Sequence, residues 1–541
     1  MKLISLLGLL VLLLIAWLLS YHKDKVNLRT VVWGLFLQFL FAVIILQKTP
    51  ASWVGMAIFA LLLIVFIFRD RIRTSWLKIL WVTGIVLASA ALSALIFLLL
   101  QVISFSLLIL VVLLAMLLNK FFLKSERIKP YLNALLVISI FTAPVARGLY
   151  GQAIFQSFSD GVAKFLSMSL YGAEFLFGNL ARTEHFFPAT SSWPGFGYLF
   201  AFVVLPTIIF FGGFISILYH FGIMQRVVEA MAKFMSWTMG TSGAETLSCS
   251  ANIFVGQTEA PLLIKPFLNE MTESELLTVM VGGFATIAGG VLAGYIAMGV
   301  NAGHLVAASV MSAPAALVIG KIIYPEIKES KTSGMVKMPQ MERSQNVLGA
   351  LSNGITDGLK LAVNVGAMLI GFIAIIAVID LGFSWLDGLI DGKLLGKDYF
   401  VYATGSGFSP VKGEYAGIFP GSIQTLFGFI FRPLAWLMGV SWNYAAEVGN
   451  LLGMKIALNE FVAYGTLGTY IQNGVIDERA QTIATYAICG FANFSSIGIQ
   501  LGGIGALAPG RKNTLAKIAL KAMFGGAIAS WITATIAGIL L

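Results

Sequence analysis

Long apolar runs constrain the fold of this chain more than any other feature. Seven runs are long enough to cross ~30 Å of hydrocarbon as helices, over residues 3–20, 31–47, 52–68, 79–100, 102–119, 131–148 and 197–219. Hydrophobic residues make up 58% of the chain and charged residues 11%, whereas soluble domains carry about 45–50% and about 25%. Because lipid offers the backbone no hydrogen-bond partners, such runs must be helical. The sequence therefore predicts an all-α polytopic membrane protein.

The net charge of +10 is interpreted from the positions of the basic residues along the chain. Lys and Arg gather in short connections at 23–29, 69–78 and 120–129. The positive-inside rule places these loops in the cytoplasm, so the first helix begins outside. Topology explains the charge, and we expect no nucleic-acid partner. The two cysteines, Cys249 and Cys489, have no metal-ligand spacing and indicate no disulfide framework.

Two short patterns each occur twice in the chain. Asn-x-Phe-Val begins at Asn252 and again at Asn459, 207 positions later. Gly-Phe-Ala begins 31 positions after each of them, at Gly283 and Gly490. Many secondary transporters build a substrate site from polar, Gly-rich elements that are duplicated inside an apolar chain. The duplication therefore predicts two related halves around one site.

Polar residues interrupt the apolar sequence inside both copies. Residues 252–261 read NIFVGQTEAP, with apolar flanks on either side. A continuous membrane helix would leave these groups unsatisfied in lipid, whereas a re-entrant hairpin exposes them to a water-filled cavity. An ionisable residue at membrane depth is a functional candidate, which singles out Glu259. Glu460 and Asn493 are the candidates in the second copy, and Ser495 serves equally well as a helix-packing residue.

The sequence carries no enzyme signature, and we expect no catalytic residues. No His-Glu-x-x-His pattern is present. Residues 505–512 resemble a phosphate-binding loop, but Arg511 stands where the loop needs Lys, and the segment follows an apolar run instead of a strand. Without a nucleotide site, transport would have to draw on an ion gradient.

At these residues the chain resembles the concentrative nucleoside transporter family, in its bacterial form with extra helices in the N-terminal half. The resemblance rests on dense blocks: NIFVGQTEAPLLIKPF (252–267), MTESELLTVMVGGFATIAGGVLAGY (271–295), residues 312–326, DGLKLAVNVGAML (357–369), residues 439–464 ending in NEFVAY, and CGFANFSSIGIQLGGIGALAP (489–509). Residues 1–47 and 150–240 extend it. The extra segment between residues 48 and 148 departs from the short bacterial pattern.

The resemblance implies a scaffold domain that trimerises and a transport domain of two inverted repeats with re-entrant hairpins, which moves as an elevator. The expected boundaries follow the chain. They are 1–220 for scaffold helices, with an extra helical insertion at about 49–148; 221–345 for the first transport repeat, with a hairpin near 245–270; 346–384 for a scaffold helix; and 385–541 for the second transport repeat, with a hairpin near 470–500.

The resemblance also assigns the site residues. The base would be contacted by Gln257, Thr258, Glu259, Val291 and Phe491, and the ribose by Glu460, Asn493 and Ser496. Side-chain and backbone oxygens of Asn252, Val255, Thr286 and Ile287 would hold Na⁺. The chemistry agrees, because a carboxylate accepts strong hydrogen bonds from ribose hydroxyls. Oxygen ligands without thiolates suit Na⁺ better than a transition metal.

The predicted function is a cation-coupled symporter that imports nucleosides such as uridine, with Na⁺ as the coupling ion. Its partners would be the nucleoside, the lipid of a bacterial inner (plasma) membrane, and two further copies in a homotrimer. Thr286 stands where sodium-coupled bacterial members are expected to have Ser, and H⁺ coupling through Glu259 or Glu460 is the alternative. A carrier of another small polar solute, such as a carboxylate, would need Arg or Lys at the hairpin tips. Purine or pyrimidine preference stays open.

Overall fold

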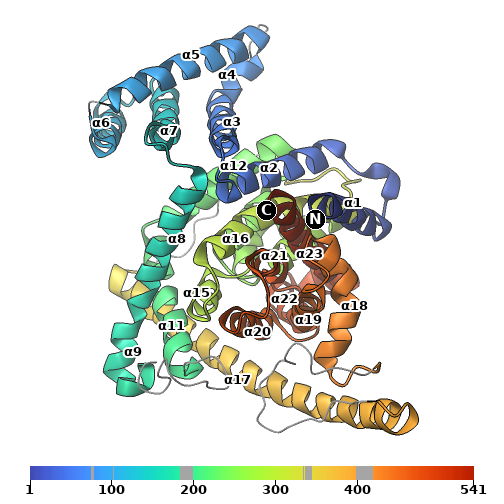
Figure 1. The fold of residues 1–541 in the computed structure, drawn as a ribbon. Helices are drawn as coiled ribbons and strands as arrows, with labels where there is room; N and C mark the ends of the chain where they lie inside the picture. The colour runs from blue at the N-terminus through green and yellow to red at the C-terminus, as the bar shows by residue number, and fades with distance from the viewer. Residues whose placement is uncertain (75–77, 102, 183–198, 333, 335–343, 398–417) are drawn as a thin grey trace. The chain divides into compact units, whose positions relative to one another are not determined.

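The computed structural model describes residues 1–74, 78–101, 103–182, 199–332, 334, 344–397 and 418–541, and their regular elements are all helices. Nine of the helices in these ranges are long and apolar enough to cross a membrane. The chain forms two compact units. Figure 1 shows the fold with the chain coloured from its N-terminus to its C-terminus. The smaller covers residues 39–158 and 540, and the larger covers residues 1–38, 159–539 and 541. Residues 335–343 and 398–417, next to two predicted domain boundaries, lie outside the described residues.

The smaller unit contains the extra segment that departs from the family pattern. Its helices coincide with the four apolar runs there, and α7 packs against three of the others. They are α3 (Pro50–Ile67), α4 (Arg69–Thr74), α5 (Lys78–Leu99), α6 (Phe105–Leu118) and α7 (Lys129–Ala146). Ile64, Ile96 and Ile138 belong to its buried core. Large apolar side chains such as Leu87 and Leu98 stay exposed, as expected for a surface that faces lipid.

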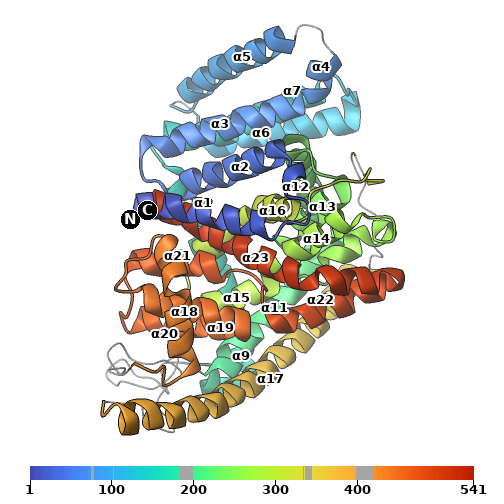
Figure 2. The ribbon, with the colours of Figure 1, turned by 90° about the vertical axis from the view of Figure 1, so that its right-hand side faces the viewer.

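Two helices of the larger unit pack against each other through small residues. They are α11 (Phe200–His220) and α17 (Val347–Asp387). A Cβ added to Gly212 would lie 2.8 Å from the Gly354 carbonyl oxygen, and one added to Gly358 would lie 2.9 Å from Ile209 Cα. Small residues let membrane helices approach this closely. The 41 residues of α17 span about 60 Å at 1.5 Å per residue. Figure 2 shows α17 running along the edge of this unit.

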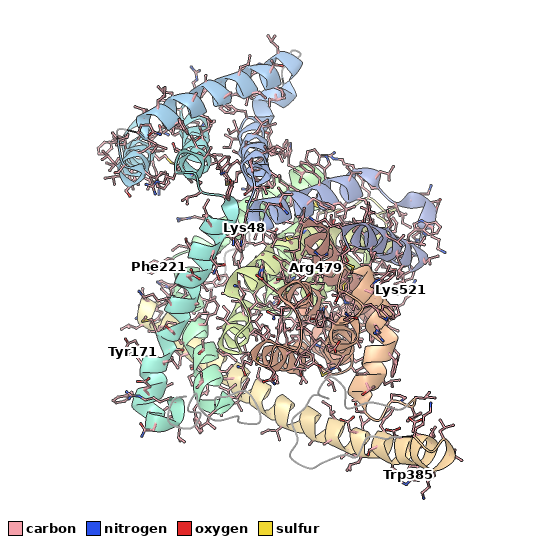
Figure 3. The ribbon with its side chains drawn as sticks, viewed as in Figure 1. Lys48, Tyr171, Phe221, Trp385, Arg479 and Lys521 are labelled. Carbon is pink, nitrogen blue, oxygen red and sulfur yellow. The ribbon has the colours of Figure 1, made fainter. Side chains whose placement is uncertain are left out.

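Six further helices belong wholly or in part to this unit. They are α1 (Lys2–Leu18), α2 (Leu28–Leu46), α8 (Gly151–Ser167), α9 (Ser169–Phe177), α12 (Ile223–Met239) and α18 (Ile423–Leu437). Helix α9 packs against α11, and α1 packs against α18. Tyr171, Phe221 and Trp385 carry exposed aromatic side chains (Figure 3). Exposed aromatic rings are common where membrane proteins meet the lipid interface.

The first repeat is a helix hairpin followed by an interrupted helix and a continuous one. Its elements are α13 (Gly243–Asn252), the 3₁₀ segment η4 (Ala260–Phe267), α14 (Glu273–Ala285), α15 (Gly289–Ala297) and α16 (Ala302–Ile323). Helix α13 packs against η4, so residues 253–259 form the tip of the hairpin. Capping boxes at Ser242 and Thr272 begin α13 and α14. The break between α14 and α15 covers only residues 286–288.

The second repeat has the same order of elements. They are α19 (Ala445–Ala457), α20 (Glu460–Gln472), α21 (Glu478–Ile488), α22 (Phe494–Leu507) and α23 (Lys512–Leu540). Helices α19 and α20 pack against each other, so the second hairpin covers residues 445–472 and corrects the boundary expected near 470–500. Its two-residue tip, Leu458 and Asn459, is inconspicuous in the sequence. The longer break at 489–493, which ends in Asn493, interrupts the helix that follows the hairpin.

The first hairpin opens toward the basic side of the membrane. At its open end the Lys321 ammonium of α16 pairs with the Glu245 carboxylate of α13 at 2.8 Å. Tyr324 follows α16 and packs on Tyr21, with ring centroids 4.7 Å apart. Tyr21 directly precedes the basic loop at 23–29. The open end therefore lies on the side of this basic loop, which the positive-inside rule predicts to be cytoplasmic.

The second hairpin opens toward the other side. Arg479 of α21 (Figure 3) follows the hairpin and donates hydrogen bonds to the carbonyl oxygens of Gly439 and Gly538, at 2.9 and 2.6 Å. In the same region Ser5 Oγ donates to the Met438 carbonyl oxygen at 3.2 Å. Ser5 lies at the end of α1 that is remote from the basic loop. The fold is therefore a scaffold with a transport domain of two inverted repeats.

The two Gly-Phe-Ala patterns meet where the interrupted helices cross. The Phe491 N–H donates to the Thr286 carbonyl oxygen at 3.3 Å. Gly490 has a φ of +127°, and a Cβ there would lie 2.6 Å from the Phe284 carbonyl oxygen. Only glycine combines this backbone conformation with this close approach. The shared pattern therefore marks the point where the two repeats touch.

We predict that Gly490→Ala lowers the free energy of unfolding by about 2 kcal/mol or more, because the methyl group adds backbone strain and a collision with another backbone. Thermal unfolding of the purified protein in detergent measures the change. Gly502→Ala is the matched control, because a Cβ at Gly502 in α22 meets no atom within 4 Å. Equal melting temperatures for the two variants would contradict this explanation of the glycine.

Candidate functional site

A cavity of about 180 Å³ lies between the hairpin tips and the helix breaks of the two repeats. The eight residues predicted to contact the substrate all line it, and they are Gln257, Thr258, Glu259, Val291, Glu460, Phe491, Asn493 and Ser496. Leu361 and Val365 of α17 complete the lining from outside the repeats. The structure thus brings residues from both repeats and one neighbouring helix around a single space.

Glu460 is the buried acid of this cavity, with 4% of its surface exposed. It is the first residue of α20, where the free N–H groups of a helix N-terminus favour a negative charge. Its Oε1 accepts a hydrogen bond from the Tyr295 hydroxyl at 3.2 Å, and its Oε2 accepts one from Asn493 Nδ2 at 3.1 Å. A carboxylate has about four acceptor sites. Two donors therefore hold it in place and leave further lone pairs for a ligand hydroxyl.

Asn493 is oriented by the helix that it caps. Its Oδ1 accepts hydrogen bonds from the Ser496 N–H at 2.8 Å and from Ser495 Oγ at 2.7 Å, at the start of α22. Because Oδ1 serves as the helix cap, Nδ2 is the amide atom that faces Glu460. The need to cap α22 thus fixes the Asn493 side chain, so that its Nδ2 donates to the Glu460 carboxylate.

Gln257 connects the first hairpin tip to the second repeat. Its Nε2 donates to Ser496 Oγ at 3.2 Å, and its Oε1 accepts from Gln500 Nε2 at 3.0 Å. Gln500 Nε2 also donates to the Met280 carbonyl oxygen at 3.1 Å. Gln257 and Gln500 are both buried. This amide pair therefore couples the tip residue to both interrupted helices.

Glu259 lies where the small cavity meets a larger one. The larger cavity measures about 480 Å³ and is lined by α11, α17 and the first hairpin. Both cavities are lined by Glu259, Ala288 and Leu361. The Glu259 side chain is exposed, and its Oε2 accepts a hydrogen bond from the Gly256 N–H at 3.0 Å. The larger cavity extends to His220 and Ser344, near the basic side of the fold.

Asn252 is a buried amide without a hydrogen-bond partner. It ends α13 with 1% of its surface exposed, and neither Oδ1 nor Nδ2 has a partner among the described residues. Such a buried group is costly to leave unpaired. Val255, Thr286 and Ile287, the other predicted ion residues, are buried as well. The Thr286 hydroxyl donates to the Gly282 carbonyl oxygen at 2.8 Å and keeps its own lone pairs free.

These four residues fit a monovalent cation better than a divalent or transition metal. They supply amide, hydroxyl and carbonyl oxygens, and none is a carboxylate or thiolate. Divalent hard cations usually recruit carboxylates, and transition metals favour nitrogen or sulfur ligands. Within the described ranges no group of three or more His, Cys, Asp or Glu side chains could hold a metal ion. The unpaired Asn252 Oδ1 is the strongest sign that a ligand belongs here.

Sequence reasoning missed three residues that hold the site together: Tyr295, Asn459 and Gln500. Tyr295 stacks on Tyr464 with ring centroids 4.3 Å apart, and Asn459 Oδ1 caps α20 through the Val462 N–H at 3.0 Å. Tyr295 and Gln500 lie inside blocks that carry the family resemblance, but their spacing to Glu460 and Gln257 gives no sign of contact. Asn459 could have been found, because it begins the second copy of the repeated pattern.

Three family models match parts of the chain. Residues 7–55 match the N-terminus of Na⁺-dependent nucleoside transporters, residues 304–538 match their C-terminus, and residues 201–302 match a nucleoside recognition (gate) domain. An uncharacterized transporter of Haemophilus influenzae is 40% identical over 422 residues, which cover 77% of this chain and 93% of the relative.

Mammalian relatives and solved structures agree with these matches. Sodium/nucleoside cotransporter 2 of Mus musculus is 41% identical over 416 residues, and the matched part covers 74% of this chain and 57% of the relative. The structure of CNTnw in an inward-facing, substrate-bound state is 29% identical, with a TM-score of 0.69 and coverage of 99% of this chain and 98% of that one. A variant of CNTnw in an outward-facing state gives a TM-score of 0.70.

We predict that Gln500→Ala destabilises the protein by about 1–3 kcal/mol, because it leaves the buried Gln257 Oε1 without its donor and removes the additional bond to the Met280 carbonyl oxygen. Thermal unfolding of the purified protein measures the effect. Gln101→Ala, at an exposed position in the smaller unit, should leave the melting temperature unchanged. A Gln500→Ala protein as stable as the Gln101→Ala control would show that this bridge does not stabilise the fold.

Proposed function

Because this integral membrane protein belongs to the concentrative nucleoside transporter family, we propose that it is a Na⁺-coupled symporter that imports nucleosides such as uridine. The observation that carries the proposal is the buried Glu460 carboxylate, which Tyr295 and Asn493 hold facing the same small cavity as the Gln257 amide. A sugar hydroxyl and a base edge need these two kinds of group at a short separation. Such an arrangement serves binding and release, without a chemical step.

The second repeat supplies the ribose contacts in this proposal. The Glu460 carboxylate accepts hydrogen bonds from ribose hydroxyls, and such charge-assisted bonds are about twice as strong as neutral ones. Asn493 and Ser496 lie on the same side of the cavity and add a neutral donor and a hydroxyl. A site built to bond hydroxyls rejects analogues that lack them, because its own buried groups are then left unpaired. We therefore expect ribonucleosides to be preferred over deoxynucleosides.

The first repeat supplies the base contacts and the ion site. Gln257 and Thr258 offer an amide and a hydroxyl to the base edge, and Val291 and Phe491 offer apolar surface to its faces. Asn252 ends α13 directly before the hairpin tip and precedes Gln257 by five positions. An ion that pairs with Asn252 would fix the tip in the conformation that binds the base. Binding of the ion would then raise the affinity for the nucleoside, and binding of the nucleoside would raise the affinity for the ion by the same factor.

The cavities support an elevator-type mechanism. The route from the small cavity through Glu259 runs between the first hairpin and the scaffold helices α11 and α17, toward the basic, cytoplasmic side. The two repeats pack on each other through α14 with α22 and α15 with α20. Access from the opposite side would therefore require both repeats to move together along α11 and α17.

Rival readings of the site are less well supported. A carrier of carboxylates would need a cation at the site, and neither Arg nor Lys is among the residues that line the small cavity. H⁺ coupling through Glu259 or Glu460 stays the alternative to Na⁺ coupling. The unpaired Asn252 amide supports Na⁺, because a proton relay has no use for it. The homotrimer stays a proposal, supported by exposed apolar residues along α17 such as Ile370 and Val378.

The test is counterflow of labelled uridine into proteoliposomes prepared with Na⁺ or with choline, each with and without a pH gradient. We predict uptake that needs Na⁺ and does not respond to the pH gradient alone. Asn252→Ala should raise the Na⁺ concentration for half-maximal uptake by about tenfold, because it removes one oxygen ligand worth about 1.5 kcal/mol.

Asn133→Ala is the matched control, because Asn133 lies in α7 of the smaller unit and outside both cavities of the larger one. It should keep the wild-type Na⁺ dependence. Uptake driven by a pH gradient without Na⁺ would replace Na⁺ by H⁺ as the coupling ion. Absence of uridine counterflow under every condition, in protein that stays folded, would overturn nucleoside transport.

A further inference from the structure

Lys455 is a fully buried lysine on α19 that the proposed site does not use. It has 0% of its surface exposed, and no carboxylate among the described residues lies within ion-pair distance of it. Its Nζ donates to the carbonyl oxygens of Ala487 at 3.1 Å and Cys489 at 3.5 Å. A charged group at such a position is costly and is a functional candidate by default.

The carbonyl oxygens that bind Lys455 belong to the end of a half-helix. Helix α21 ends at Ile488, immediately before the break that leads to Asn493. The last carbonyl groups of a helix have no intrahelical partner and carry partial negative charge. An ammonium group donates hydrogen bonds to these carbonyl oxygens and carries the opposite charge. Lys455 also interacts electrostatically with Glu460, the acid of the small cavity.

The repeat relates Lys455 to a position beside the proposed ion site. The offset of 207 residues pairs Lys455 with Ser248, and Asn459 with Asn252. Ser248 and Asn252 are one turn apart at the end of α13, whereas Lys455 lies in the last turn of α19 and Asn459 follows that helix as the cap of α20. In both repeats the pair lies at the tip end of the first helix of the hairpin. The two pairs therefore occupy corresponding corners of the two repeats.

The corresponding corners also meet corresponding backbone positions. A Cβ added to Gly282 would lie 3.3 Å from Asn252 Nδ2, so the Asn252 amide lies against Gly282. Lys455 Nζ donates to Cys489, and Cys489 is the residue 207 positions after Gly282. The ammonium of the second repeat and the amide of the first thus face the same point on their respective interrupted helices.

The two corners differ in how their polar atoms are satisfied. In the first repeat, Ser248 Oγ and both polar atoms of Asn252 are buried without a partner. In the second repeat, Lys455 fills the corner with positive charge, and Asn459 Oδ1 accepts the Val462 N–H. One corner therefore lacks a ligand, and the other contains its own cation.

We propose that Lys455 is a tethered cation that takes, in the second repeat, the place that the coupling ion takes in the first. This inference rests on the proposed Na⁺-coupled function. It assigns one Na⁺ ion to each protomer and explains why a carboxylate can bind the sugar in the second repeat without a second ion. The lysine stabilises the helix break and offsets the charge of Glu460, whether or not nucleoside is bound.

The test measures binding of ²²Na⁺ and of uridine to the purified wild-type protein and to Lys455→Ser, which copies Ser248 of the first repeat. Wild type should bind one Na⁺ per protomer, with a Hill coefficient near one. In Lys455→Ser, uridine affinity at low Na⁺ should fall by about tenfold or more, because a buried charge loses its compensation. High Na⁺ should restore it, with a Hill coefficient near two and a second bound ion.

The reciprocal variant Ser248→Lys provides a second test, for the case in which Lys455→Ser does not fold. It should bind uridine with an affinity that no longer depends on Na⁺. Two Na⁺ ions per wild-type protomer would overturn the inference. So would wild-type Na⁺ dependence in either variant, or a folded Lys455→Ser that binds no uridine at any Na⁺ concentration. If wild type itself binds no uridine with Na⁺, the proposed function fails instead, independently of Lys455.

Discussion

The contact between the two interrupted helices is the constraint on which the rest of this structure depends. At that depth lipid offers no hydrogen-bond partner, so each break must be satisfied by protein. The Phe491 N–H reaches the Thr286 carbonyl oxygen, and Gly490 lets the second break approach Phe284 without a side chain between them. The two breaks therefore meet directly, and the second uses a carbonyl oxygen of the first. The cavity exists because the backbone opens at this point.

The two repeats share the elements that build the fold and differ in those that bind. Both have a short hairpin and an interrupted helix with Gly-Phe-Ala at the interruption, at the end of α14 in the first repeat and within the break between α21 and α22 in the second. The first carries Gln257 at its tip and an unpaired Asn252 just before it, whereas the second carries Glu460 at the start of a helix. The site therefore has two chemically distinct sides. The first repeat presents polar atoms without partners, and the second contains the charged groups Glu460 and Lys455. A nucleoside, with a base at one end and hydroxyls at the other, matches that difference.

The sequence predicted the parts of the fold that follow from local rules. Apolar runs located the helices of the smaller unit, and the doubled Asn-x-Phe-Val and Gly-Phe-Ala patterns indicated the repeats. The second hairpin was misplaced because its tip at Leu458 and Asn459 is only two residues long, while the conspicuous Gly and polar residues at 490–496 belong to the interruption of a different helix. An interruption within a helix and the tip of a helical hairpin use the same types of residue. Packing between α19 and α20 distinguishes them, and it is not local in sequence.

The candidate site was predictable only as a set of residues. Family resemblance chose twelve positions, and the structure brings eight of them to one cavity and buries the other four nearby. The partners that orient them could not be found from spacing, because they are distant in the chain. Tyr295 and Glu460 are 165 positions apart, and Gln257 and Gln500 are 243 apart. These contacts depend on how the repeats cross.

The central claim is that the second repeat binds the sugar through Glu460. It is tested most directly by the affinities of uridine and 3′-deoxyuridine for the wild-type and Glu460→Gln proteins, measured by calorimetry at saturating Na⁺. We predict that removal of the hydroxyl weakens wild-type binding by about tenfold to a hundredfold, as for a hydrogen bond to a charged group. In Glu460→Gln the two ligands should bind with nearly equal affinity. An unchanged ratio in the variant would contradict the claim, because the hydroxyl would then be recognised elsewhere.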